Sequence, residues 1–197
     1  MNGPSDPVAA RRGFAGVDPG LSGGLALVSP DGALLATSRM PVHRGATGEG
    51  ALDLRALRDL LRSWSPRAVF VERQHPMPRQ GLCSTFTTGR NYGMLLATLA
   101  LGDFHTPALG DFRIVIDHAK AWQKTYKGVA AGGGSAKATA LAIASALWPS
   151  ESWMATEKSR RPHDGIIDAA LMAEHLRRQE CSHGPANAFI AIPDFLK

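Results

Sequence analysis

The stretch FAGVDPGLSGGLALV, residues 14–28, limits the folds open to this chain more than any other part of the sequence. Small and apolar residues fill it as they fill a buried strand, yet Asp18 ends the first apolar run and a Pro-Gly turn follows at once. The pattern predicts two strands, 14–18 and 23–29, joined by that turn. A carboxylate at the sheltered end of a buried strand is either a turn former that bonds local backbone groups or part of a functional site.

Strands and helices alternate along the rest of the chain. Three antiparallel strands come first, and each later strand is preceded by a helix, which is the pattern of parallel strands joined by crossovers. The sequence therefore predicts an α/β fold in which a mixed five-stranded sheet is flanked by helices. The further predicted elements are strands at 33–40, 68–72 and 113–117 and helices at 52–64, 92–102, 135–149 and 164–178.

Length and composition favour one globular domain. The chain has 197 residues, 44% of them hydrophobic and 20% charged, and no uncharged apolar run approaches the roughly 20 residues of a membrane span. We expect a flexible arm at 1–13 that lacks the apolar core of a secretory signal, a domain at 14–178 and a tail at 179–197. A cytoplasmic protein without a membrane partner follows as an expectation. Cys83 and Cys181 stand too far apart in sequence to suggest a metal knuckle or a disulfide framework.

Four acidic residues are candidates for one site. Asp18 ends the first strand and Glu72 ends the fourth. If these strands are parallel neighbours, both side chains lie at the same edge of the sheet, where ligands bind in such folds. Asp164 and Asp168 are four residues apart, so a helix places them on one face.

A cluster of four carboxylates is unfavourable by itself, because like charges at short range oppose ionisation, and divalent cations relieve it. Oxygen ligands suit Mg²⁺ or Mn²⁺. Two such ions can activate a water on one side of a phosphodiester and stabilise the leaving oxygen on the other. The sequence therefore predicts a hydrolytic nuclease that uses two Mg²⁺ ions, with Mn²⁺ as a substitute.

Each of these residues also has a structural interpretation. Asp18 could serve the turn, Glu72 could pair with a nearby arginine, and Asp164 could cap the last helix. Asp168 is harder to explain in this way, because it stands inside an apolar helical face. His163 could coordinate a metal or position water, and the alternative is an incidental histidine beside the cap.

The chain is basic, with a formal net charge of +5. This charge favours an acidic polymer such as nucleic acid as a partner, and the alternative is a solvated basic surface. Three groups of basic side chains are candidates for contacts with a phosphate backbone. They are Arg73, Arg79 and Arg90; Lys120, Lys124 and Lys127; and Lys158, Arg160 and Arg161.

Three motifs together resemble one known family. GVDPGLSGG, VFVERQHPMP and HDGIIDAALMAEHL are similar to the motifs of RuvC-type Holliday junction resolvases, in the ribonuclease H-like or retroviral integrase superfamily. The resemblance covers about 14–178 and is closest to the branch with phage and bacterial RuvC-like enzymes and the chloroplast resolvase. In that branch the last acidic pair is also spaced by four, whereas bacterial RuvC more often spaces it by three. Gly165 stands at the latter position here, which leaves open whether His163 or Asp164 is the outer ligand.

The resemblance implies a ribonuclease H-like fold and a ligand set. Asp18 resembles the ligand shared by both metals, Glu72 a ligand of one, and Asp164 with Asp168 ligands of the other. It also implies a homodimer that nicks four-way DNA junctions by two symmetric, Mg²⁺-dependent cuts. Lys124 first, and then Lys137, are candidates for holding the scissile phosphate.

The stretch 73–93 matches the junction-contacting loop of the family. Phe86 and Tyr92 offer stacking surfaces, and Arg79 and Arg90 offer charges for phosphates or bases. A plain packing role is the alternative for all four. The helix with Met94, Leu95 and Leu99 would supply the dimer contact by resemblance, and a stripe that faces the core is the alternative. The full set of DNA-binding candidates is Arg73, Arg79, Phe86, Arg90, Tyr92, Lys120, Lys127 and Lys137.

Two other classes of function remain as alternatives. Sugar kinases and actin-like ATPases also place a DxG turn after the first strand, but no second DxG turn follows a strand here. The glycine-rich stretch 128–135 lacks the GK[ST] ending of a P-loop and is interpreted as a linker. A branched-DNA-binding module that does not cleave is the other alternative, although all four acids are present.

Overall fold

The computed structural model describes residues 13–44, 50–102, 104, 112–127 and 135–183. The expected arm, apart from Gly13, lies outside the described residues. So do most of the predicted linker at 128–135 and the tail from residue 184 onward.

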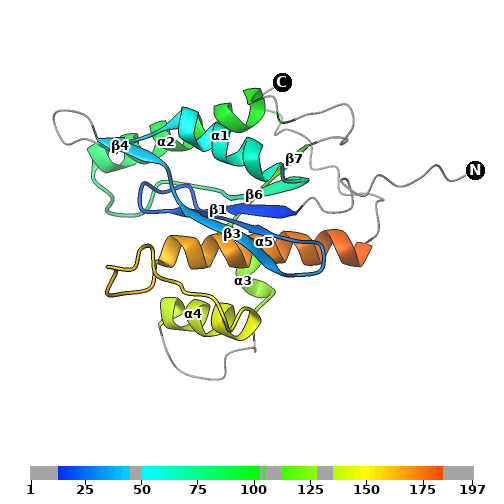
Figure 1. The fold of residues 1–197 in the computed structure, drawn as a ribbon. Helices are drawn as coiled ribbons and strands as arrows, with labels where there is room; N and C mark the ends of the chain where they lie inside the picture. The colour runs from blue at the N-terminus through cyan, green and yellow to red at the C-terminus, as the bar shows by residue number, and fades with distance from the viewer. Residues whose placement is uncertain (1–12, 45–49, 103, 105–111, 128–134, 184–197) are drawn as a thin grey trace, which may run out of the picture.

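A five-stranded mixed sheet in the order β3-β2-β1-β6-β7 forms the centre of the fold (Figure 1). β1 pairs with β2 and β2 with β3 in antiparallel fashion, whereas β1 pairs with β6 and β6 with β7 in parallel. The predicted fold class is confirmed. The strands are β1 (Phe14–Val17), β2 (Gly24–Val28), β3 (Leu34–Arg39), β6 (Ala68–Glu72) and β7 (Arg113–Asp117).

A second, two-stranded sheet was not predicted. It consists of β4 (Val42–Arg44) and β5 (Gly50–Leu52), which pair in antiparallel fashion. Strands of three residues are too short to show an alternating pattern, and the sequence between them is rich in glycine and threonine, which favours a loop.

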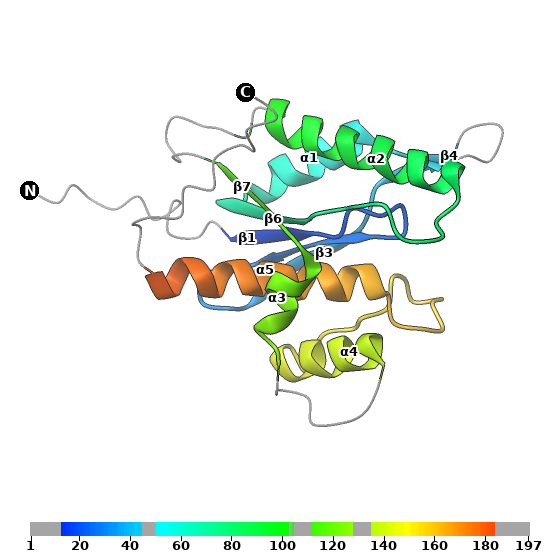
Figure 2. The same cartoon turned by 180° about the vertical axis from the view of Figure 1, so that it is seen from behind.

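Helices cover both faces of the large sheet, as the view from behind shows (Figure 2). Alternate residues of β1 and β6 pack into different cores, because successive side chains of a strand point to opposite faces. Ala15 and Val69 pack with α1 and α2, whereas Phe14 and Phe70 pack with α3, α4 and α5. The helices are α1 (Leu54–Trp64), α2 (Leu82–Leu101), α3 (Ala119–Lys124), α4 (Ala136–Leu147) and α5 (Asp164–His183).

Two helices begin within two residues of their predicted starts, each after a side chain that caps it. Asp53 accepts a hydrogen bond from the Ala56 backbone N–H at 3.0 Å and caps α1. Ser135 does the same for α4 through the Ala138 N–H at 3.3 Å. Such side chains satisfy donors that the first turn of a helix leaves unpaired.

α2 begins earlier than the sequence suggested. It starts at Leu82, so Phe86 and Arg90 stand on a helix and not in a loop, and Tyr92 lies in the middle of the helix and not at its start. The glycines and short polar residues of this stretch favoured a loop, but the apolar stripe farther along the helix anchors it to the sheet. Leu95 and Leu99 are buried in that core, so they face the chain's own interior and offer no surface to a second subunit.

α5 lies unusually close to β1 and β2. A Cβ added at Gly16 would stand only 2.0 Å from the Ala169 carbonyl oxygen, and one at Gly24 only 2.8 Å from the backbone of Gly165. Side chains at these positions would therefore force the helix away from the sheet. Gly23 and Gly165 also form an isolated parallel bridge. In the glycine pair of the first motif, Gly24 is required by the contact with α5, and Gly23 by the Asp18 carbonyl oxygen, which would lie 2.1 Å from an added Cβ.

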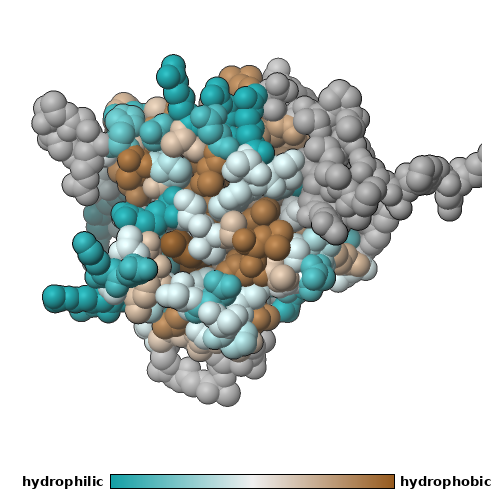
Figure 3. All heavy atoms as spheres, viewed as in Figure 1, coloured by the Kyte–Doolittle hydropathy of each residue, from teal (hydrophilic) through white to brown (hydrophobic). Residues whose placement is uncertain are grey.

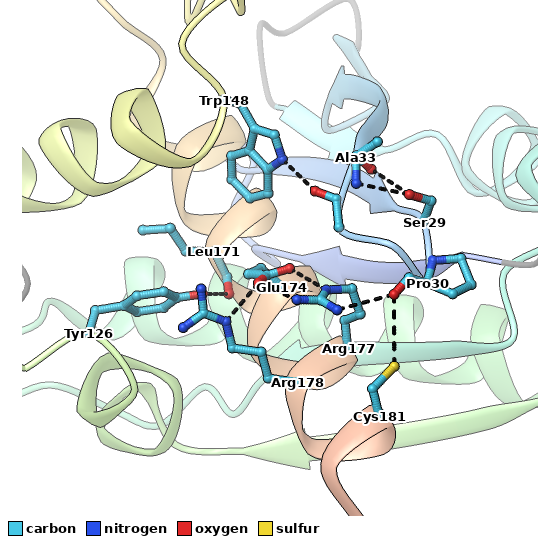
Figure 4. Close-up of polar contacts among 11 residues, drawn as sticks. Ser29, Pro30, Ala33, Tyr126, Trp148, Leu171, Glu174, Arg177, Arg178 and Cys181 are labelled. Atoms are coloured by element: carbon cyan, nitrogen blue, oxygen red, sulfur yellow. Dashed lines mark hydrogen bonds and ion pairs between the residues drawn. The ribbon is translucent and has the colours of Figure 1, made fainter. Parts of the chain in front are cut away.

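An ion-pair network around the buried Glu174 fixes the far half of α5 (Figure 4). Glu174 is 3% exposed and accepts hydrogen bonds from Arg177 and Arg178. Arg177 also donates to the Pro30 carbonyl in the β2–β3 turn at 3.1 Å. Farther along the helix, Arg113 forms an ion pair with Glu180. α5 continues to His183, beyond the expected end at 178.

The visible face of the molecule mixes polar and apolar regions (Figure 3). Hydrophilic side chains project from the segment before α5, where Lys158, Arg160 and Arg161 are exposed. An apolar patch lies over β3 (Figure 3). Leu35 of this strand is exposed. Among the described residues, no helix is both long and apolar enough to cross a membrane.

Candidate active site

The four acidic candidates come from three elements that meet at one end of the sheet. Asp18 directly follows β1, and Glu72 is the last residue of β6. Because Val17 pairs with Val71 in the parallel register, the two carboxylates leave neighbouring strands side by side. Asp164 opens α5 and Asp168 follows one turn later, on the helix that the glycine contacts hold against β1 and β2. Asp18, Asp164 and Asp168 line one open pocket.

Burial and mutual repulsion raise the pKa of two of these carboxyls. Burial raises the pKa of Asp18 to about 6, and the charge of Glu72 adds to the effect. Burial also raises the pKa of Asp168 to about 7, and the charges of Asp18, Glu72 and Asp164 follow as causes. The carboxylates therefore oppose one another's ionisation across the pocket.

One lysine reaches the cluster. Lys137, in the first turn of α4, places its Nζ 2.5 Å from Oδ2 of Asp164. This hydrogen bond raises the pKa of Lys137. Among the described residues, no arginine forms an ion pair with Asp18, Glu72 or Asp168, so the arginine-paired interpretation of Glu72 does not apply there.

The donor set fits a hard divalent cation in its chemistry. Carboxylate oxygens are the ligands that Mg²⁺ and Mn²⁺ prefer, and the raised pKa values mark negative charge that the protein leaves uncompensated. Lys137 stands beside Asp164 as the cationic partner in this conformation. In the described part of the chain, no three acidic, histidine or cysteine side chains already form a closed ligand set. A cation bound at Asp164 would compete with Lys137 for this carboxylate.

His163 has a structural role in this conformation. Its Nδ1 accepts a hydrogen bond from the Ile166 N–H at 3.3 Å, and its carbonyl accepts from Ile166 and Ile167. His163 therefore caps α5, which leaves Asp164 free of that function. Burial lowers the pKa of His163, and the positive charge of Arg39 adds to the effect. Both His163 and Asp164 line the pocket, so the choice of outer ligand stays open.

The structure places the predicted phosphate and base contacts in different parts of the surface. Phe86 and Arg90 line a second hollow that shares Leu21, Cys83 and Thr87 with the acidic pocket. Phe86 is 72% exposed, whereas Tyr92 is half-buried and packs against the core beneath α2. The exposed candidates that line neither hollow are Arg73, Arg79, Lys120, Lys124 and Lys127.

Sequence reasoning missed the polar face of α2 in the acidic pocket. Cys83, Ser84, Thr87 and Thr88 line it together with Asn91. Asn91 is 3% exposed, and its Oδ1 has no hydrogen-bond partner among the described residues. A helical period of short polar residues would have been the signal, but the glycines in this stretch concealed it.

The raised pKa values predict how the metal-free protein responds to pH. A folded state in which Asp168 titrates near 7 holds a proton that the unfolded state releases near 4, so this group costs stability as the pH rises through that range. Asp168→Asn removes the ionisation. We expect the variant to be more stable than wild type by on the order of 2 kcal/mol at pH 8 in EDTA, and the difference to shrink toward pH 5.

Thermal unfolding of both proteins between pH 5 and pH 8 measures this difference. Asp59→Asn on α1 is the matched control, because the Asp59 side chain is 61% exposed and lies in no such cluster. A difference that does not change with pH, or an Asp168→Asn variant that is less stable at pH 8, would contradict the clustering.

No family profile matches this chain, and no curated protein matches it by sequence. Solved structures do match. T. thermophilus RuvC in complex with a Holliday junction substrate superposes with a TM-score of 0.53 at 17% identity, over 85% of this chain and 94% of that chain. The yeast mitochondrial Holliday junction resolvase Ydc2 gives a TM-score of 0.53 at 12% identity, over 86% of this chain and 80% of that chain. The chain therefore has the ribonuclease H-like fold in the form found in these resolvases, as its motifs implied.

Proposed function

We propose that this protein is a structure-selective endonuclease that depends on divalent metal ions and resolves four-way DNA junctions. The observation that carries the proposal is the meeting of four mutually repelling carboxylates at the ends of β1 and β6 and on α5, three of which, Asp18, Asp164 and Asp168, line one open pocket. Two solved structures with this fold are Holliday junction resolvases, and one of them is bound to a junction. Both observations support the same chemistry.

The protein's own groups have distinct parts in this reaction. Asp18 and Glu72 would hold one Mg²⁺ ion, and Asp18 with Asp168 and Asp164 would hold a second. Such ions supply an activated water and stabilise the leaving oxygen of the phosphodiester. The open pocket leaves room for the DNA strand to approach these carboxylates.

Lys137 is the lysine that we assign to the scissile phosphate. It already reaches the acidic cluster, whereas Lys124 is exposed and does not line the pocket. If Asp164 turned toward a bound cation, the ammonium group of Lys137 would be free to donate to a non-bridging phosphate oxygen. A preorganised cation at this place stabilises the charge that develops in the transition state.

The hollow next to the acidic pocket suits the unpaired bases at a strand crossing. Leu82 and Phe86 offer exposed apolar surfaces there, and Arg90 offers a positive charge. Base stacking on an aromatic ring tolerates any sequence, and arginine neutralises phosphate. We infer that α2 contacts the junction through this end.

Two symmetric cuts require two active sites. We therefore infer a homodimer, which the resemblance to the resolvases also implies. Leu95 and Leu99 are buried and cannot form its contact. The exposed side of the same helix, with Gly93, Ala97 and Leu101, is available instead.

Asp18→Asn tests the role of the carboxylates. We expect junction cleavage in Mg²⁺ to fall at least about 100-fold, since a shared ligand is lost, while junction binding in EDTA stays close to wild type because phosphate contacts lie elsewhere. Gel assays of cleavage and binding on four-way and linear DNA measure both quantities.

Asp59→Asn, which changes an exposed side chain of α1, serves as the control that keeps cleavage. Equal loss of binding and cleavage in Asp18→Asn would make Asp18 a structural residue. Wild-type protein that binds the junction and never cuts it would instead favour the non-cleaving DNA-binding module.

Lys137→Met and Lys124→Met form a matched pair that tests the choice of lysine. Both remove one exposed positive charge, so any general electrostatic loss of DNA affinity should be similar. We expect Lys137→Met to lower the single-turnover cleavage rate about 100-fold and Lys124→Met to change it little. The opposite order would return the role to Lys124.

A further inference from the structure

Trp122 on α3 contacts the acidic cluster at Glu72, the last residue of β6. The Trp122 side chain is 4% exposed, and its Nε1–H donates a hydrogen bond to Oε2 of Glu72 at 2.9 Å. The two residues are 50 positions apart, so the fold creates this contact. Glu72 pairs in register with Asp117 at the end of β7, and α3 begins two residues later. The indole is therefore directed back toward the carboxyl end of β6.

The segment that carries Trp122 is fixed to α5, the helix that bears two of the acids. The Tyr126 hydroxyl donates to the Leu171 carbonyl at 2.7 Å. The Thr125 hydroxyl and Nδ1 of His175 lie 2.6 Å apart, within hydrogen-bond distance. Both partners belong to α5. Trp122 is thus held by the same helix that positions Asp164 and Asp168 relative to the sheet.

Two other buried tryptophans show that the bond to Glu72 is not a simple requirement of burial. Trp148 donates to the Gly32 carbonyl at 2.9 Å, a backbone group (Figure 4). The buried Nε1 of Trp153 has no hydrogen-bond partner among the described residues. Of these three indoles, Trp122 alone donates to a side-chain carboxylate.

Glu72 is the member of the cluster that most needs such a restraint. A glutamate has one more rotatable bond than an aspartate and loses more side-chain entropy when it is fixed. Asp164 is held by Lys137, and Asp18 accepts a hydrogen bond from the backbone of Gly20. An indole N–H occupies one oxygen of Glu72 without adding a positive charge, so the other oxygen and the full negative charge remain for a cation.

We propose that Trp122 is a positioning residue, which orients the Glu72 carboxylate for metal binding through the hydrogen bond from its indole N–H. The proposal rests on the proposed metal-dependent function. Partners of this kind commonly change metal affinity by about 10- to 100-fold when they are removed.

Calorimetric titration of the metal-free full-length protein with Mn²⁺, without DNA, tests the proposal independently of cleavage. Trp122→Phe removes the donor and keeps an aromatic ring in the core. We expect the dissociation constant for Mn²⁺ to rise at least about 10-fold. Trp122→Leu, which also lacks the donor, should give the same direction of change and replaces Trp122→Phe if that variant does not fold.

Trp148→Phe is the matched control. It removes one buried hydrogen bond from an indole to a backbone carbonyl, so it should lower unfolding stability about as much as the loss of the Trp122 bond does. The Trp148 indole donates to no carboxylate of the cluster, so the Mn²⁺ dissociation constant of this variant should stay close to that of wild type.

The outcomes separate the two proposals. If wild type binds Mn²⁺ and the Trp122 variants bind it equally well, the positioning role of Trp122 is wrong and the proposed function stands. If Trp148→Phe weakens Mn²⁺ binding as much as Trp122→Phe, the effect is a general loss of structure and the positioning role is again wrong. If wild type does not bind Mn²⁺ at all, the proposed function fails, and the role of Trp122 with it.

Discussion

The close approach of α5 to β1 determines where the acidic side chains meet. With no side chain at Gly16, the backbone of α5 at Ala169 lies against the strand, and Asp168 stands one residue before that contact. One turn earlier along the helix, Gly165 of α5 lies equally close to Gly23 and Gly24 at the start of β2. A helix carried on ordinary side chains would stand farther from the sheet, and its carboxylates would affect the pKa of Asp18 less.

This packing concentrates negative charge, and the rest of the site responds to it. Burial and repulsion favour the protonated forms of Asp18 and Asp168, and Lys137 neutralises Asp164 from the start of α4. A neutral indole, that of Trp122, holds Glu72 without reducing the charge. A protein that only needed stability would have placed apolar groups here, because the cluster costs folding energy. The cost is understandable if cations complete the site.

Much of this arrangement could be predicted from the sequence, because it depends on local patterns. Apolar runs that end in Asp18 and Glu72 identified two strands and the end of the sheet where their carboxylates meet, and the spacing of Asp164 and Asp168 identified one helical face. The remaining features depend on contacts between distant segments. The bond from Trp122 to Glu72 and the reach of Lys137, in place of Lys124, follow from tertiary packing that no local period encodes. The early start of α2 was missed because exposed glycines resemble loop residues when the packing of the helix is unknown.

The central claim is that divalent cations belong between carboxylates contributed by β1, β6 and α5. Anomalous diffraction from crystals of the wild-type protein grown with Mn²⁺ tests it most directly. The account predicts peaks within bonding distance of Asp18, Glu72 and Asp168, with Lys137 withdrawn from Asp164. Crystals saturated with Mn²⁺ that show no peak at Asp18, and an unchanged contact between Lys137 and Asp164, would contradict it.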